Sequence, residues 1–183
     1  TNQYPDIVKI LAVGNEAMVK WATSYYVQPG VILKWVNHLQ DLKKRGELPK
    51  DLWITSSDNF ASWGGGHDEY HVEDLKKLIH AVDYISMHTY PMHDTHYNPD
   101  FWGVQTSETS LSDKKKVDAS MIRARDYAIH QFQNVVKYMK SLGVNKPVHI
   151  GETGWATQSN EHYGETGSKA TDEYKSAKYY KLI

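Results

Sequence analysis

Cysteine is absent from the 183-residue chain, which excludes a disulfide framework, a thiolate metal site and a cysteine nucleophile. Long hydrophobic runs are missing too. The longest, Ile7 to Val13, is interrupted by Lys9 and is far too short to span a bilayer. Neither charge is in excess, because 21 basic side chains face 22 acidic ones. We therefore expect neither nucleic acid nor a membrane as a partner.

The start of the chain lacks a signal-peptide pattern and a starting Met, so we expect a processed or truncated piece of a longer protein. The one basic run, 114–116, lies among acidic residues and is interpreted as a solvated face. Phenylalanine is scarce, with 3 Phe against 13 Tyr and 6 Trp. Tyr and Trp suit surfaces that stack on polar rings, although ordinary half-exposed packing explains them more simply.

Four short apolar runs are predicted as buried strands, and helical periodicity separates them. The strands are expected at 7–13, 52–56, 84–88 and 148–150. The helices are expected at 31–42, 72–81, 128–142 and 170–183. Gly46 and Gly143 are predicted to end the first and third helices. A long polar stretch is expected from Pro91 to about Asp118.

Strands that alternate with helices predict parallel βαβ units, in either a doubly wound open sheet or a (β/α)8 TIM barrel. Each predicted strand runs into polar or aromatic residues, which favours the barrel. The cluster Gly64-Gly65-Gly66 lies in mid-loop, unlike a dinucleotide fingerprint. A barrel needs roughly 250 residues. We therefore expect residues 1–183 to form about half of a single catalytic barrel.

Two glutamates, Glu16 and Glu152, each follow a predicted strand next to glycine. Cleavage of a glycosidic bond needs one carboxyl group that protonates the leaving oxygen. It needs a second one as nucleophile or as base for water. The placement of the pair is therefore compatible with glycoside hydrolysis, although a single glutamate after a strand is usually a solvated loop residue.

The motifs around these glutamates, Val13-Gly14-Asn15-Glu16 and Ile150-Gly151-Glu152-Thr153-Gly154-Trp155, resemble the two active-site signatures of glycoside hydrolase family 17. The resemblance implies a (β/α)8 barrel of which this chain covers strands four to seven. It implies retaining hydrolysis of β-1,3-glucan such as laminarin. The stretch from Met87 to His93 resembles the plant members only loosely, so the sugar subsites are expected to differ.

By this resemblance Glu16 is the acid/base and Glu152 the nucleophile of a double displacement. Asn15 is expected to hydrogen-bond the hydroxyl beside the reacting carbon, Tyr90 to donate to Glu152, and Trp155 to lie under a glucose ring. Further substrate contacts are expected at Asp58, Asn59, Trp63 and His88. Two carboxyl groups in one cleft raise the pKa of one of them, and we expect Glu16 to be that partner.

The spacing of several histidines suggests a metal-binding site as an alternative interpretation. His67 and His71 are four residues apart, and His88, His93 and His96 form a looser group. Three glycines precede the first pair, which disfavours a helix there, so we interpret these residues mainly as loop histidines. No metal and no cofactor are expected.

Three functions stay open at this point: a β-1,3-glucanase, a β-1,3-glucanosyltransferase with the same glutamates, and a non-catalytic carbohydrate-binding fragment. The expected partner is a β-glucan. Because half a barrel leaves open sheet edges, we also expect a complementary barrel fragment or a second copy of the chain. The family resemblance implies a secreted or periplasmic location.

Overall fold

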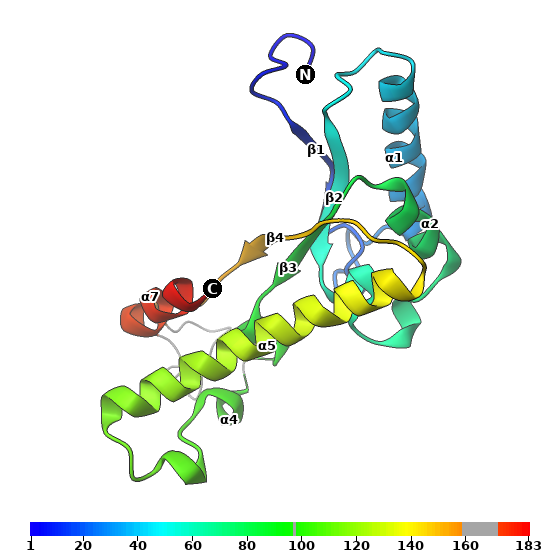
Figure 1. Ribbon diagram of the computed structural model, residues 1–183. Helices are drawn as coiled ribbons and strands as arrows, with labels where there is room; N and C mark the ends of the chain where they lie inside the picture. Colours follow the sequence, from blue (N-terminus) through cyan, green and yellow to red (C-terminus); the bar gives the residue numbers. More distant parts are fainter. Residues whose placement is uncertain (97, 159–171) are drawn as a thin grey trace. The chain divides into compact units, whose positions relative to one another are not determined.

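The computed structural model describes residues 1–96, 98–158 and 172–183. The chain divides into two compact units. The first comprises residues 1–88 and 131–151, and the second comprises 89–130 and 152–183. Figure 1 traces the alternation of strands and helices along the chain.

A four-stranded sheet forms the centre of the first unit, in the order β1-β2-β3-β4. Its strands are β1 (Ile10–Asn15), β2 (Trp53–Asn59), β3 (Ile85–Thr89) and β4 (Val148–Thr153), of which the last residues of β3 and β4 fall in the second unit. The pairs β1–β2 and β2–β3 are parallel, with Ile10 opposite Trp53 and Ser57 opposite Ser86. Parallel pairing requires the helical crossovers that the periodicity predicts.

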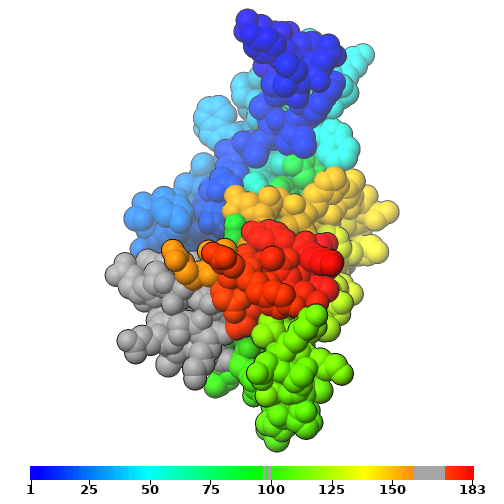
Figure 2. All heavy atoms as spheres, turned by 90° about the vertical axis from the view of Figure 1, so that its left-hand side faces the viewer, coloured from blue at the N-terminus to red at the C-terminus, as the bar shows by residue number. Residues whose placement is uncertain are grey.

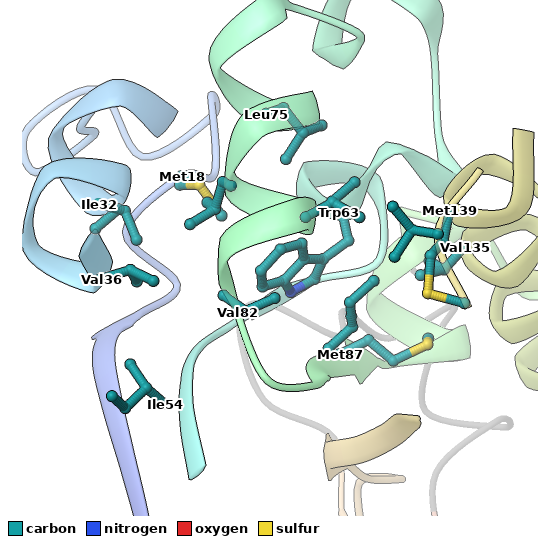
Figure 3. Packing of buried hydrophobic residues seen from close by; sticks show 14 residues of the cluster. Met18, Ile32, Val36, Ile54, Trp63, Leu75, Val82, Met87, Val135 and Met139 are labelled. Atoms are coloured by element: carbon teal, nitrogen blue, oxygen red, sulfur yellow. The ribbon is translucent and has the colours of Figure 1, made fainter. Parts of the chain in front are cut away.

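Helices α1 (Pro29–Lys44), α2 (Glu73–Ala81) and the C-terminal end of α5 (Asp113–Ser141) pack in the first unit. A π-helical turn η1 (Ala61–Gly65) and a 3-10 turn η2 (Asp68–Tyr70) connect β2 to α2. Trp63 lies at the centre of the core, fully buried among aliphatic and methionine side chains (Figure 3). Its indole N–H donates to the Ser86 carbonyl oxygen over 2.9 Å.

Ile54 is buried on one face of the sheet, and large apolar side chains are exposed on the other face. Ile10 is 48% exposed, and its register partner Trp53 is 38% exposed. The Trp53 ring lies 5.3 Å from the ring of Tyr84 and 6.0 Å from that of His149. This face therefore presents an apolar, aromatic surface that folding of the first unit leaves accessible.

The second unit holds short helical turns, the N-terminal part of α5 and helix α7 (Glu173–Leu182). The turns are α3 (Pro91–Asp94), α4 (Pro99–Trp102) and η3 (Thr106–Glu108). Its core is largely aromatic: Trp102 meets Trp155 edge-to-face at 5.1 Å, and Tyr179 of α7 lies 5.7 Å from Trp155. The outer side of α7, red in Figure 2, lies at the surface, where Tyr174 and Tyr180 are exposed.

The predicted strands and the first two helices are confirmed, with shifts of up to three residues at their ends. The third helix is confirmed, but it begins at Asp113 and not at 128. Gly46 and Gly143 follow their helices with φ of 78° and 74°, the left-handed conformation that glycine adopts most easily. The long polar stretch was wrong at its end, because α5 begins at Asp113 and takes up its last residues. Val117, Met121 and Ala124 continue its apolar stripe towards the N-terminus and pack in the second core. The predicted start of the last helix at 170 lies outside the described residues.

No helix in the described part of the chain has both the length and the apolar character needed to cross a membrane. In Figure 2 the N-terminal residues, dark blue, lie at the surface. Tyr4 and Ile7 there are 54% and 77% exposed.

Candidate active site

Glu16 follows β1 directly and adopts a left-handed backbone conformation, with φ of 47°. Two contacts to β2 hold it there. The N–H of Glu16 donates to the Ser57 carbonyl oxygen, and the N–H of Met18 donates to the Asp58 carboxylate, each over 2.9 Å. A glutamate is rarely left-handed, so this conformation is imposed by its surroundings. The Glu16 side chain stays 32% exposed.

His88 of β3 lies beside Glu16, and its side chain is fully buried. The imidazole Nδ1 is 3.1 Å from Glu16 Oε1, and Nε2 is 2.7 Å from the Ser57 hydroxyl. The predicted contact of His88 with sugar hydroxyls is therefore wrong, because the ring has no accessible surface. Its two nitrogens contact protein groups instead.

Glu152 lies near the end of β4, in the second unit. The Tyr90 hydroxyl donates to Glu152 Oε2 over 3.0 Å, so the predicted hydrogen bond is confirmed. On the next residue, the Thr153 hydroxyl is 2.6 Å from the Tyr179 hydroxyl. Burial raises the pKa of Tyr179 to about 12. The last two residues of β4 are thus each hydrogen-bonded to a tyrosine hydroxyl.

Asp58 and Asn59 at the end of β2 are buried, with exposures of 0% and 3%. Burial raises the pKa of Asp58 to about 6, although the N–H groups of Met18 and Asn59 lower it. The Asn59 side-chain oxygen accepts from the N–H of Ala61 over 2.9 Å. The expectation that Asp58 and Asn59 contact substrate is therefore wrong, since both side chains hold loop backbone in place.

Trp63 and Trp155 also differ from expectation. Trp63 is 0% exposed and belongs to the first core, so its predicted substrate contact is wrong. Trp155 is 4% exposed and packs against other aromatic rings, so it offers a sugar no open ring face. The side chain of Asn15, the last residue of β1, is exposed, and its role toward substrate stays a prediction.

Two serines near Glu16 were not singled out from the sequence. Ser57 and Ser86 are register partners on β2 and β3, and their hydroxyls are 2.9 Å apart. The alternation of side chains along a strand places His88 on the same face as Ser86. Only the register of β2 against β3 would have indicated that these two serines lie side by side.

The two histidines that suggested a metal site, His67 and His71, lie in different surroundings. His67 is exposed before the η2 turn. His71 stacks on Tyr138 at 3.9 Å, and its Nε2 is 2.9 Å from the Gly64 carbonyl oxygen. A Cβ on Gly64 would lie 2.1 Å from the Tyr138 ring, which explains a glycine with φ of 85° at this position.

Polar side chains at the carboxyl ends of parallel strands are typical of α/β-barrel enzymes. Glycoside hydrolysis uses two carboxyl groups, and the chain places Glu16 directly after β1 and Glu152 near the end of β4.

The structure closely resembles the crystal structure of an endo-laminarinase from Formosa Hel1_33_131, with a TM-score of 0.95 and 70% sequence identity. The match covers 100% of this chain and 46% of the laminarinase chain, so the chain spans about half the length of that protein. No protein-family model and no curated protein matches the chain. The fold that the chain shares with half of the laminarinase is α/β, with four parallel strands that alternate with helices.

Proposed function

We propose that the chain is part of a β-1,3-glucan hydrolase that cleaves laminarin-like glucan with retention. In this proposal Glu16 is the general acid/base and Glu152 the nucleophile. The observation that carries the proposal is the 70% identity to an endo-laminarinase across the whole chain. The resemblance of both glutamate motifs to glycoside hydrolase family 17 also supports it.

The surroundings of the two glutamates support these roles. A nucleophile must stay ionised until it attacks the sugar, and the Tyr90 hydroxyl, 3.0 Å from Glu152, stabilises the carboxylate by donating to it. An acid/base must give up a proton and take one back. Glu16 contacts an imidazole, which both donates and accepts hydrogen bonds.

We further propose that the chain supplies strands four to seven of a (β/α)8 barrel. The interior of such a barrel is filled by side chains from every strand. The exposed Ile10 and Trp53 on one sheet face are suited to that interior. A complementary barrel segment, or a second copy of the chain, would then cover this face. Because the substrate is a polysaccharide, we propose a secreted or periplasmic location.

The test is release of reducing sugar from laminarin by the wild-type chain and by Glu152→Ala. Loss of the nucleophile is expected to lower kcat by about 10⁴-fold. Azide, a small anionic nucleophile, should restore turnover of Glu152→Ala and yield a glucosyl azide of inverted configuration. Glu47→Gln, a change at an exposed glutamate after α1, should keep the wild-type rate.

Other outcomes select other functions. Equal rates for wild type and Glu152→Ala would remove Glu152 as nucleophile. Products longer than the starting oligosaccharide would favour a β-1,3-glucanosyltransferase, since a sugar hydroxyl then replaces water as acceptor. Binding of laminarin without turnover would favour the carbohydrate-binding fragment.

A further inference from the structure

A line of hydrogen-bonded side chains leads from the sheet of the first unit to Glu16. The Ser86 hydroxyl is 2.9 Å from the Ser57 hydroxyl, which is 2.7 Å from His88 Nε2. His88 Nδ1 is 3.1 Å from Glu16 Oε1. The four residues come from the ends of β2 and β3 and from the residue after β1.

Ser86 and His88 are buried, whereas Ser57 and Glu16 are half-buried. Ser86 is 5% exposed and the His88 side chain 0%, while that of Glu16 is 32% exposed. In a buried site hydrogen bonds hold a side chain more firmly than they do in water. One end of the line therefore lies in the rigid sheet, and the other end reaches the carboxylate proposed to act on substrate.

Gly151 adds a constraint from β4. A Cβ at this position would lie 2.3 Å from the Ser86 hydroxyl oxygen and 2.9 Å from that of Ser57. Any larger residue would therefore displace the serine pair. The glycine before Glu152 thus leaves room for the Ser57 hydroxyl, which contacts His88, and for the Ser86 hydroxyl, which contacts Ser57.

Elementary chemistry sets the direction of the hydrogen bonds when Glu16 is ionised. A carboxylate only accepts, so His88 Nδ1 must carry the proton that it donates. Nε2 of the neutral imidazole is then an acceptor, and the Ser57 hydroxyl donates to it. Ser57 in turn accepts from Ser86. With the imidazole neutral, Ser86 thus donates to Ser57, Ser57 to His88 and His88 to Glu16.

We infer that His88 is a positioning residue for Glu16, and that Ser57 and Ser86 hold its imidazole in the tautomer that donates to the carboxylate. The inference rests on the proposed function, in which Glu16 transfers a proton. His88 touches no substrate, because its ring is buried. Asp58 is a second carboxyl group whose charge interacts with His88, and it is buried behind the same loop.

Three substitutions at His88 separate positioning from packing. His88→Ala removes both nitrogens. His88→Asn keeps an amide group near Nδ1, on the side of Glu16, whereas His88→Gln keeps one near Nε2, on the side of Ser57. We expect kcat/KM on laminarin to fall about 10- to 100-fold in the Ala and Gln variants. The Asn variant should recover most of this loss.

The leaving group provides a readout that a purely structural role would not change. An aryl β-laminaribioside with a dinitrophenolate leaving group needs no protonation, and kcat/KM covers only the steps up to the glycosyl-enzyme. With this substrate the loss in His88→Ala should shrink to about threefold or less. Ser57→Ala should show the same pattern with a smaller loss on laminarin.

Equal kcat/KM values for His88→Ala and His88→Asn, or equal losses on both substrates, would overturn the positioning role while wild-type activity leaves the proposed function intact. If the wild-type chain, assembled with its complementary barrel segment, cleaves neither substrate, the proposed function is overturned, and the positioning role with it. Nitrogen NMR of His88 adds a direct measurement, because the inference requires a protonated Nδ1 in the neutral ring. A protonated Nε2 there would contradict it.

Discussion

The two glutamates are supported by different chemistry in the two units. In the first unit Glu16 has a left-handed backbone and a buried imidazole beside its carboxylate. In the second unit Glu152 has an extended strand backbone and a phenol that donates to it. A phenol stays neutral and donates throughout the acidic and neutral range, whereas an imidazole also has a nitrogen that accepts.

The hydrophobic cores of the two units differ as well. The first unit packs mostly aliphatic and methionine side chains around one tryptophan, Trp63. The second unit has a smaller core in which Trp102, Trp155 and Tyr179 meet through their rings. A large aliphatic core holds a sheet and its register, and so keeps the Glu16 loop in a conformation that a glutamate rarely adopts. The aromatic core instead anchors the segment that follows β4.

The largest expected effect comes from removing the two buried indoles. Trp63→Ala and Trp155→Ala should each lower the free energy of unfolding by about 4 kcal/mol, because each leaves a large cavity in its core. Urea unfolding followed by circular dichroism measures the loss. Trp35→Ala, at a position that is 52% exposed, is the matched control and should change stability little. If Trp155→Ala were to weaken laminarin binding at unchanged stability, the indole would be a sugar platform after all.

The next effect concerns Asp58, which holds the Glu16 loop. Its pKa is raised from 3.8 to about 6 by burial, so the folded state binds the proton more tightly than the unfolded state does. The free energy of unfolding should therefore fall by about 3 kcal/mol as pH rises from about 4 to above 6. Asp58→Asn, which carries no charge, should abolish this decline in urea titrations at several pH values. Asp51→Asn, at an exposed position, should preserve the decline, and a decline that persists in Asp58→Asn would assign it to another group.

The smallest expected effect sharpens the contrast at Glu152. Tyr90→Phe removes the hydroxyl that donates to the carboxylate and leaves the ring in place. A hydrogen bond to a charged group contributes about 2 kcal/mol, so kcat on laminarin should fall about 30-fold with little change in KM. Steady-state kinetics measures both constants. Tyr174→Phe, on an exposed tyrosine of α7, serves as the control, and an unchanged kcat in Tyr90→Phe would show that Glu152 needs no donor from Tyr90.

Local patterns sufficed for much of the fold. Apolar runs and three- and four-residue periodicity located four strands and the helices between them, because burial of one face determines both patterns. Gly46 and Gly143 marked two helix ends through their conformational freedom. The first half of α5 was not predicted, because its start is rich in charged residues and its apolar stripe is short. The structure shows that Val117, Met121 and Ala124 lie on one face of this helix and pack in the second core.

The hydrogen bond from Tyr90 to Glu152 was also predicted from the sequence, because both residues lie at strand ends. Which residues are accessible to a substrate could not be predicted. Trp63, Asp58 and His88 stand at or beyond strand ends just as binding residues do, but the packing of β2, β3 and the loops between them buries all three. Burial depends on contacts between residues far apart in the chain, and side-chain type does not encode it.

The hydrogen-bonded line from Ser86 to Glu16 illustrates the same limit. The sequence contains each of its members, yet only the register of β2 against β3 brings Ser57, Ser86 and His88 within hydrogen-bond distance. A shift of that register by one residue would turn these side chains to the opposite face. The sequence therefore identified residues with catalytic chemistry. Their hydrogen-bond partners and their burial were determined by strand pairing and core packing in the tertiary structure.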